Sequence, residues 1–109
     1  MSVRHLLAGV ALVLFGSASA TEEQDGKAVF QRWCTHCHGD QPGAPGRLRL
    51  GWNRGEEFAR LAQRHDLDAA TITRVLRLGQ LEMPAFRKTE ITDVDLAVLI
   101  DYLTHKAAP

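Results

Sequence analysis

The sequence predicts a small all-α domain of about four helices, and three observations support this prediction. Candidate capping boxes and an Asp N-cap mark places where helices begin. Behind them, apolar residues recur at the three- and four-residue spacing of a helix that buries one face. The flanks of the one closely spaced cysteine pair have a helical pattern and a Gly/Pro-rich loop, not the β-branched runs typical of strands.

The first predicted helix covers residues 21–33. Thr21 and Gln24 form a capping box, and acidic residues lie in the first turn, where the helix dipole favours negative charge. A loop is predicted over residues 39–55, because proline and glycine recur throughout that stretch. We expect no long helix and no central strand there.

The middle of the chain predicts two more helices. A short one covers residues 56–64, and the next covers residues 69–78, with Asp68 as its N-cap and Gly79 at its C-terminal end. The residues expected on their buried faces are Phe58, Leu61, Ala62, Ile72, Val75, Leu76 and Leu78.

The last predicted helix covers residues 93–105. Thr92 and Asp95 form its capping box. Its apolar residues available for burial are Val94, Ala97, Val98, Ile100 and Leu103.

The N-terminus, residues 1–20, has the pattern of a secretory signal peptide. A short chargeable start, Arg4 and His5, precedes an apolar run, and small residues at positions 17–20 predict cleavage after Ala20. The alternative is a membrane anchor, but the apolar run is shorter than the roughly 20 residues that span a bilayer. We therefore expect export to the periplasm or another exported location, with no membrane span in the mature chain.

The remaining residues, 21–109, are expected to form one small domain. The full chain has 13 Lys and Arg against 13 Asp and Glu and contains no basic block, which argues against a nucleic-acid partner. A domain of this size builds only a modest hydrophobic core unaided, so a buried apolar cofactor would add to its stability.

Residues 34–38 read Cys-Thr-His-Cys-His, the Cys-x-x-Cys-His signature for covalent attachment of a c-type haem. One turn of helix places both thiols and the imidazole on one rim. Cys34 and Cys37 would bond the haem vinyl groups, and His38 would offer a ring nitrogen to the iron.

A Cys-x-x-Cys pair has other uses, which are weaker here. A closed zinc site needs four Cys or His ligands, and this chain has only 2 cysteines and no second His-rich cluster. A thioredoxin-like redox pair needs a βαβ surround, which the flanks do not predict. A structural disulfide is the remaining alternative.

Met83 is the expected sixth iron ligand. Apart from Met1 it is the only methionine, and Pro84 beside it favours an extended backbone from which a side chain can reach inward. Met/His ligation raises the reduction potential and leaves no open position for a substrate. The alternatives are ordinary core packing of Met83 or ligation by another histidine. Those histidines, His36, His65 and His105, are all expected at the surface.

The chain resembles the small class I c-type cytochromes over nearly all of its mature length. The resemblance extends beyond the haem motif to Gly26 and Phe30 before the first cysteine and to Leu99 and Tyr102 near the C-terminus. In the family these positions pack the first helix crosswise on the last. The resemblance implies a cytochrome c-like fold of about four helices wrapped around one covalently bound haem.

The family also has a proline-containing loop after the haem motif, in which a backbone carbonyl accepts a hydrogen bond from the ligand histidine. Pro45 or its neighbourhood is the candidate here, although the common Gly-Pro-x-Leu order is replaced. By the same resemblance, Arg47, Arg49 and Trp52 are candidates to contact the haem propionates.

Residues 83–92 look similar to cytochrome subunits that accept electrons from flavoprotein dehydrogenases of the p-cresol methylhydroxylase type. This implies a FAD-dependent dehydrogenase as redox partner. Iron with both axial positions filled favours electron transfer over catalysis, so we expect an electron carrier and no enzyme. Two alternatives remain: a ligand-binding or peroxidase-like haem protein with a labile sixth ligand, or a docking subunit with an incidental haem.

Overall fold

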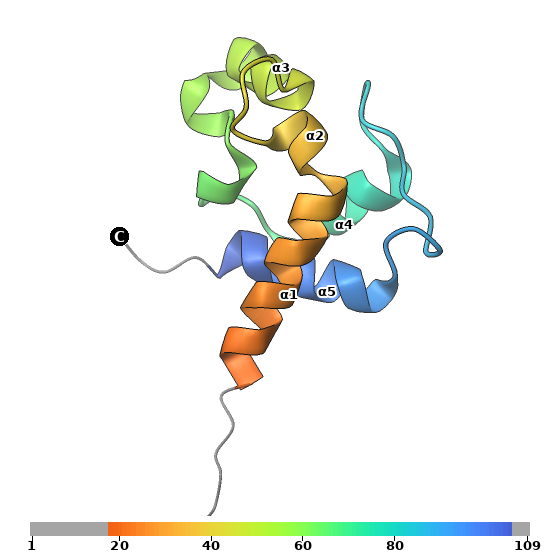
Figure 1. Ribbon diagram of the computed structural model, residues 1–109. Helices are drawn as coiled ribbons and strands as arrows, with labels where there is room; N and C mark the ends of the chain where they lie inside the picture. The colour runs from red at the N-terminus through yellow and green to blue at the C-terminus, as the bar shows by residue number, and fades with distance from the viewer. Residues whose placement is uncertain (1–17, 106–109) are drawn as a thin grey trace, which may run out of the picture.

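The structure, a computed structural model, describes residues 18–105, with side chains from residue 25 onward. The described chain consists of helices and loops, with no strand beyond an isolated bridge between Gln80 and Met83, which confirms the all-α prediction. Most of the predicted signal peptide, residues 1–17, lies outside the described residues. The helices are α1 (Ala18–Trp33), α2 (Thr35–His38), α3 (Pro45–Arg54), α4 (Ala69–Leu78) and α5 (Asp93–Thr104), with short 3-10 turns η1 (Glu56–Phe58) and η2 (Leu61–Gln63) (Figure 1).

The crossing of α1 over α5 organises the fold (Figure 1). Gly26 makes it possible, because a Cβ built there would lie 2.6 Å from the Cβ of Tyr102 and would overlap the carbonyl oxygen of Val98. Beside the crossing, the rings of Phe30 and Tyr102 stand 5.7 Å apart, and Leu99 is fully buried. The crosswise packing implied by the family resemblance is confirmed.

The hydrophobic core lies where α1, α4 and α5 meet the segment before α5. Three predictions of burial were wrong: Leu78 and Val94 are 75% and 74% exposed, and Ala97 is exposed as well. The buried residues of α4 are Ile72 and Leu76, and those of α5 are Leu96, Leu99 and Leu103. At about 100° per residue the three exposed side chains leave their helices in other directions than these buried ones. The buried cluster consists of Phe30, Ile72, Leu76, Ile91, Leu96, Leu99 and Leu103.

The predicted loop over residues 39–55 was wrong, since α3 occupies most of it. Pro45 stands in the first helical turn, where its missing N–H costs nothing and its fixed φ suits a helix. Gly55, with φ 110°, ends α3. Only residues 39–44 remain as loop, so proline marked a helix start and not a break.

The segment 56–64 was predicted as one helix but forms η1 and η2 instead. Arg60 lies between them in extended backbone geometry, which interrupts the helix. The start predicted for the first helix was also wrong: α1 begins at Ala18, so Thr21 is inside the helix and not its N-cap. Among the described residues, no helix combines the length and apolar character needed to cross a membrane.

The predicted caps of α4 and α5 are confirmed. Asp68 accepts a hydrogen bond from the Thr71 N–H at 2.7 Å, and Gly79, with φ 73°, follows the last residue of α4. At the start of α5, Thr92 and Asp95 form the complete capping box. These two ends set the positions of the loop between α4 and α5.

Candidate functional site

The one-turn helix α2 presents the predicted attachment motif. The carbonyl of Cys34 accepts hydrogen bonds from the N–H groups of Cys37 (3.1 Å) and His38 (2.8 Å), so the three side chains belong to one turn. The amide of Gln41 returns to the end of this turn and donates to the carbonyls of Thr35 (2.6 Å) and His36 (3.2 Å). This satisfies carbonyl groups that so short a helix leaves unpaired.

The two thiols differ in environment. Cys34 is partly buried beside the core, and Cys37 is exposed; both are free. Burial, assisted by Cys37, raises the pKa of the Cys34 thiol to about 12. Thiol–disulfide redox chemistry needs a thiolate, so this environment argues against a thioredoxin-like redox pair. A pair with one inner and one outer thiol on a single turn fits covalent attachment of a flat group along the rim of α2.

His38 is half-buried, and its ring lies against the start of α3. A Cβ built at Gly46 would stand 2.7 Å from Cε1 and 2.9 Å from Nδ1 of His38, so only glycine allows this approach. Burial, and secondly the positive charge of Arg64, lower the pKa of His38. The imidazole is therefore held neutral, which is the form that binds a metal.

The Nδ1 atom of His38 is buried without a hydrogen-bond partner in the described part of the protein. The expected bond to a carbonyl near Pro45 is therefore not formed. The reason is α3 itself: the carbonyls at its start are directed along the helix, where that of Ala44 accepts from the Leu48 N–H at 3.0 Å. A buried neutral ring, oriented by a glycine cradle and next to two cysteines, fits the axial ligand of a covalently attached haem.

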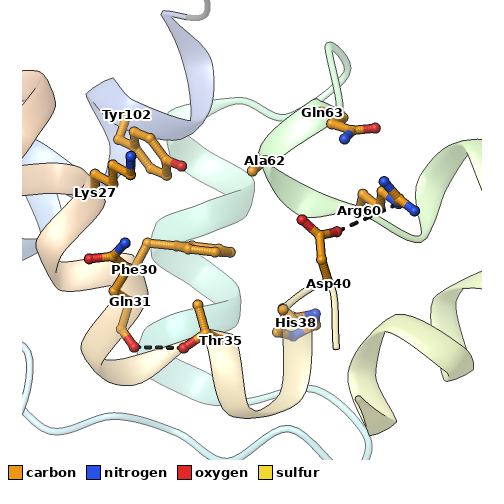
Figure 2. A pocket seen from close by; sticks show the side chains of 11 residues that line it. Lys27, Phe30, Gln31, Thr35, His38, Asp40, Arg60, Ala62, Gln63 and Tyr102 are labelled. Atoms are coloured by element: carbon orange, nitrogen blue, oxygen red, sulfur yellow. Dashed lines mark hydrogen bonds and ion pairs between the residues drawn. The ribbon is translucent and has the colours of Figure 1, made fainter. Parts of the chain in front are cut away.

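A cavity of about 150 Å³ lies beside His38, but it is not the place for a macrocycle. Cofactor pockets usually exceed roughly 300 Å³. Figure 2 shows that its lining is polar toward η2, where Asp40 and Arg60 form an ion pair at 3.6 Å, and aromatic toward Phe30 and Tyr102. The lining includes neither Cys34 nor Cys37.

Met83 ends a tight turn on the loop between α4 and α5. Its N–H donates to the Gln80 carbonyl at 2.9 Å, and the Gln80 N–H donates back to its carbonyl at 3.0 Å. This two-residue loop needs positive φ, which Leu81 adopts at 52°. The Met83 side chain is partly buried and packs against the core.

Met83 and His38 lie on separate elements, and α3 has contacts near both of them. Gly46 of α3 backs the His38 ring, and Arg49 of the same helix forms a 2.9 Å ion pair with Glu82, the residue before Met83. The pair is exposed, so its contribution to stability is small. The pair shows that α3 contacts both the His38 ring and the residue that precedes Met83.

The other predicted residues are placed as follows. Arg47 donates to the Asp40 carbonyl at 2.9 Å and pairs with Glu56 at 3.6 Å, and Trp52 is 77% exposed. Their contact with propionates, and that of Arg49, stays a prediction. The competing histidines are exposed, as expected; they are His36, His65 and His105.

Sequence reasoning missed three residues of the site. Gly46 was grouped with the loop-forming glycines, and Gln41 was not considered as a cap for α2. Arg64, only 8% exposed, was not considered as part of the site, although its charge acts on His38. Only Gly46 carried a signal, since a glycine inside a helix implies close approach of another group.

One comparison with known proteins gives a match. The model of a family described as "Cytochrome C oxidase, cbb3-type, subunit III" matches residues 21–103. No curated protein and no solved structure matches the chain. The matched range contains both cysteines of the motif, His38, Gly46 and Met83.

Proposed function

Since the chain belongs to the cytochrome family described as Cytochrome C oxidase, cbb3-type, subunit III, we propose that it is an electron carrier with a single haem c. The fold is that of a small all-α cytochrome c, and membership of the family indicates haem binding and electron transfer. The observation that carries the finer proposal is the turn of α2, where a neutral, half-buried imidazole follows two cysteines and rests on Gly46.

Each residue of the proposed site has one role. Cys34 and Cys37 would hold the haem covalently, and His38 and Met83 would ligate its iron. When bound, the haem supplies an iron that gains or loses one electron. The protein holds the imidazole against Gly46 and the residue that carries the thioether in the Gln80 turn, and neither role requires acid, base or nucleophilic chemistry. Arg47, Arg49 and Trp52 are candidates to contact the propionates.

We place the mature protein, residues 21–109, in the periplasm. The support is the signal-peptide pattern of residues 1–20, with cleavage after Ala20. Export also suits a protein whose paired cysteines are used for covalent attachment in an oxidising compartment. N-terminal sequencing of the secreted protein tests this, and an N-terminus other than Thr21 overturns the cleavage site.

The redox partner we propose is a FAD-dependent dehydrogenase, with this chain as its cytochrome subunit. The support is the similarity of residues 83–92 to the cytochrome subunits of p-cresol methylhydroxylase-type enzymes. The family description names an oxidase subunit and so supplies the competing partner. Purification from the native host distinguishes them: a flavoprotein that co-purifies supports the proposal, and an oxidase that co-purifies instead overturns it.

Mass spectrometry and optical spectroscopy of the secreted protein test the site. We expect one haem added to the polypeptide, no alkylatable thiol, and the weak long-wavelength sulfur-to-iron band of the oxidised form. Met83→Ala should abolish that band, whereas the matched control His65→Ala, at an exposed position, should keep it. Absence of the macrocycle ends the proposal; carbon monoxide binding to the reduced wild type without denaturant favours the ligand-binding alternative.

A further inference from the structure

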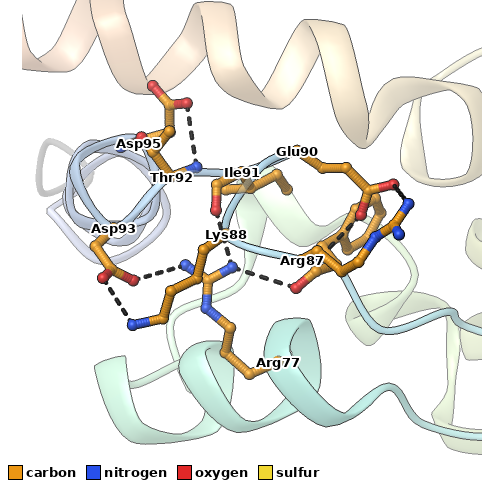
Figure 3. Close-up of polar contacts among 9 residues, drawn as sticks. Arg77, Arg87, Lys88, Glu90, Ile91, Thr92, Asp93 and Asp95 are labelled. Atoms are coloured by element: carbon orange, nitrogen blue, oxygen red, sulfur yellow. Dashed lines mark hydrogen bonds and ion pairs between the residues drawn. The ribbon is translucent and has the colours of Figure 1, made fainter.

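One arginine fastens the segment that carries Met83 to the end of α4. Arg77 lies in the last turn of α4, and its side chain is only 17% exposed. Its guanidinium donates to the carbonyl oxygens of Phe86 (3.3 Å) and Ile91 (2.8 Å) and to the carboxylate of Asp93 (2.9 Å) (Figure 3). A single side chain therefore ties α4 to three points of the loop that leads into α5.

The backbone of Phe86 is bonded to α4 through both its N–H and its carbonyl. Its N–H donates to the carbonyl of Leu76 at 2.7 Å, and its carbonyl accepts from Arg77. The Phe86 ring also stands edge-on to Trp33 of α1, 6.0 Å between centroids. The chain three residues after Met83 thus has a fixed place relative to α1 and α4.

On its other side, Met83 is fixed by the reciprocal hydrogen bonds with Gln80. Only Pro84 and Ala85 separate these bonds from Phe86, and the proline ring restricts the backbone further. Little freedom remains for Met83 as long as both anchors hold. The Gln80 bonds are local to the turn, so the turn is held in place by the Phe86 bonds on one side and by the exposed Arg49–Glu82 ion pair on the other.

Pairing with the Asp93 carboxylate is not the only role of the Arg77 side chain. Lys88, 71% exposed, binds the same carboxylate at 2.9 Å, and the hydrogen bond from Lys88 is the first cause that lowers the pKa of Asp93. One terminal nitrogen of Arg77 donates to both carbonyls while the other donates to Asp93, and a single lysine ammonium does not reproduce this planar fork. Ile91 is fully buried, so loss of Arg77 deprives a shielded carbonyl of this partner.

We propose that Arg77 is a positioning residue for Met83, which holds the thioether at the iron by tying the carbonyls of Phe86 and Ile91 to the end of α4. The proposal rests on the proposed function, in which Met83 is an iron ligand. With Arg77 in place, the Met83 turn would stay close to α4 and an added iron ligand would compete poorly with the thioether. Without it, the turn moves away from α4 more often and the added ligand binds more tightly.

The test compares Arg77→Gln with the matched control Lys88→Gln in the oxidised holoprotein. Both variants remove one cation from Asp93, but only the first removes the two carbonyl bonds. Imidazole is titrated at fixed pH while the long-wavelength sulfur-to-iron band is followed, and exchange of the Phe86 amide hydrogen is measured separately. For Arg77→Gln we expect about tenfold tighter imidazole binding and about tenfold faster exchange, equivalent to about 1.4 kcal/mol each. For Lys88→Gln we expect changes below about twofold, because Lys88 bonds only the shared carboxylate.

The outcomes separate this proposal from the proposed function. A wild-type protein without the band removes Met83 as a ligand and overturns both. A wild-type band combined with equal imidazole affinities in the two variants overturns the role of Arg77 alone. If Arg77→Gln yields no folded holoprotein, Arg77→Lys carries the test: it keeps the charge without the fork, and it must still bind imidazole more tightly than Lys88→Gln does.

Discussion

Replacement of Gly46 by alanine tests how the ligand histidine is held. The added Cβ would lie 2.7 Å from Cε1 and 2.9 Å from Nδ1 of His38, whereas unstrained carbon contacts lie at about 3.5–4.0 Å. The ring or α3 must therefore move by about 1 Å. Such overpacking costs about 1–3 kcal/mol. The higher helix propensity of alanine offsets part of this cost, because it stabilises the folded state by up to about 1 kcal/mol relative to glycine.

Gly51→Ala is the matched control, since it makes the same change within α3. There the Cβ would meet the flexible end of Glu56 at 3.0 Å and the Cβ of Ala59 at 3.6 Å, so the helix preference should dominate. The difference in unfolding free energy between the two variants removes the helix preference and leaves the contacts of position 46, with the His38 ring and with the Cys37 carbonyl oxygen at 2.9 Å. We expect Gly46→Ala to be the less stable by about 1–3 kcal/mol.

The assay is guanidinium unfolding of both holoproteins, followed by far-ultraviolet circular dichroism. Nuclear magnetic resonance of the His38 ring protons provides a second measurement, which should report a displaced ring in Gly46→Ala only. Equal stabilities for the two variants, together with unchanged ring signals, would refute the reasoning that Gly46 is required by the imidazole.

Three further predictions concern stability. Leu99→Ala, at a fully buried position, should lower the unfolding free energy by about 2–5 kcal/mol in guanidinium titrations, and a loss below about 1 kcal/mol would contradict the core assignment. Thr92→Ala removes the hydroxyl that accepts from the Asp95 N–H and should lower the unfolding free energy by about 1 kcal/mol in the same measurement. Thr92→Ser keeps a hydroxyl and should retain most of this stabilisation, and equal losses in the two variants would argue against the cap. The hydrogen bond from Arg64 lowers the pKa of Asp66 from 3.8 to about 2, so this carboxylate stabilises the fold above pH 3.8 and the contribution disappears as the pH falls toward 2. The side chain is 43% exposed, so solvent screening reduces the effect to about 1 kcal/mol; Asp66→Asn should show this deficit at pH 6 and not at pH 2, and a deficit that persists at pH 2 would contradict it.

The attachment motif and the ends of α4 and α5 could be predicted from the sequence because each depends on residues within one or two turns. The spacing of Cys34, Cys37 and His38 needs only the geometry of one helical turn. Asp68 and Thr92 form their caps with N–H groups three residues ahead. Interactions of this range are the same wherever the segment lies in a fold.

Only the tertiary structure decided what surrounds these local elements. Pro45 and Gly46 gave the signal of a loop, yet α3 forms there because the glycine lets the helix rest on the His38 ring. The burial that keeps this ring neutral, and the bonds from Arg77 that fix the loop of Met83, join residues far apart in the chain. A periodic pattern carries no information on such contacts, because their free energy depends on which surfaces meet after the helices have packed.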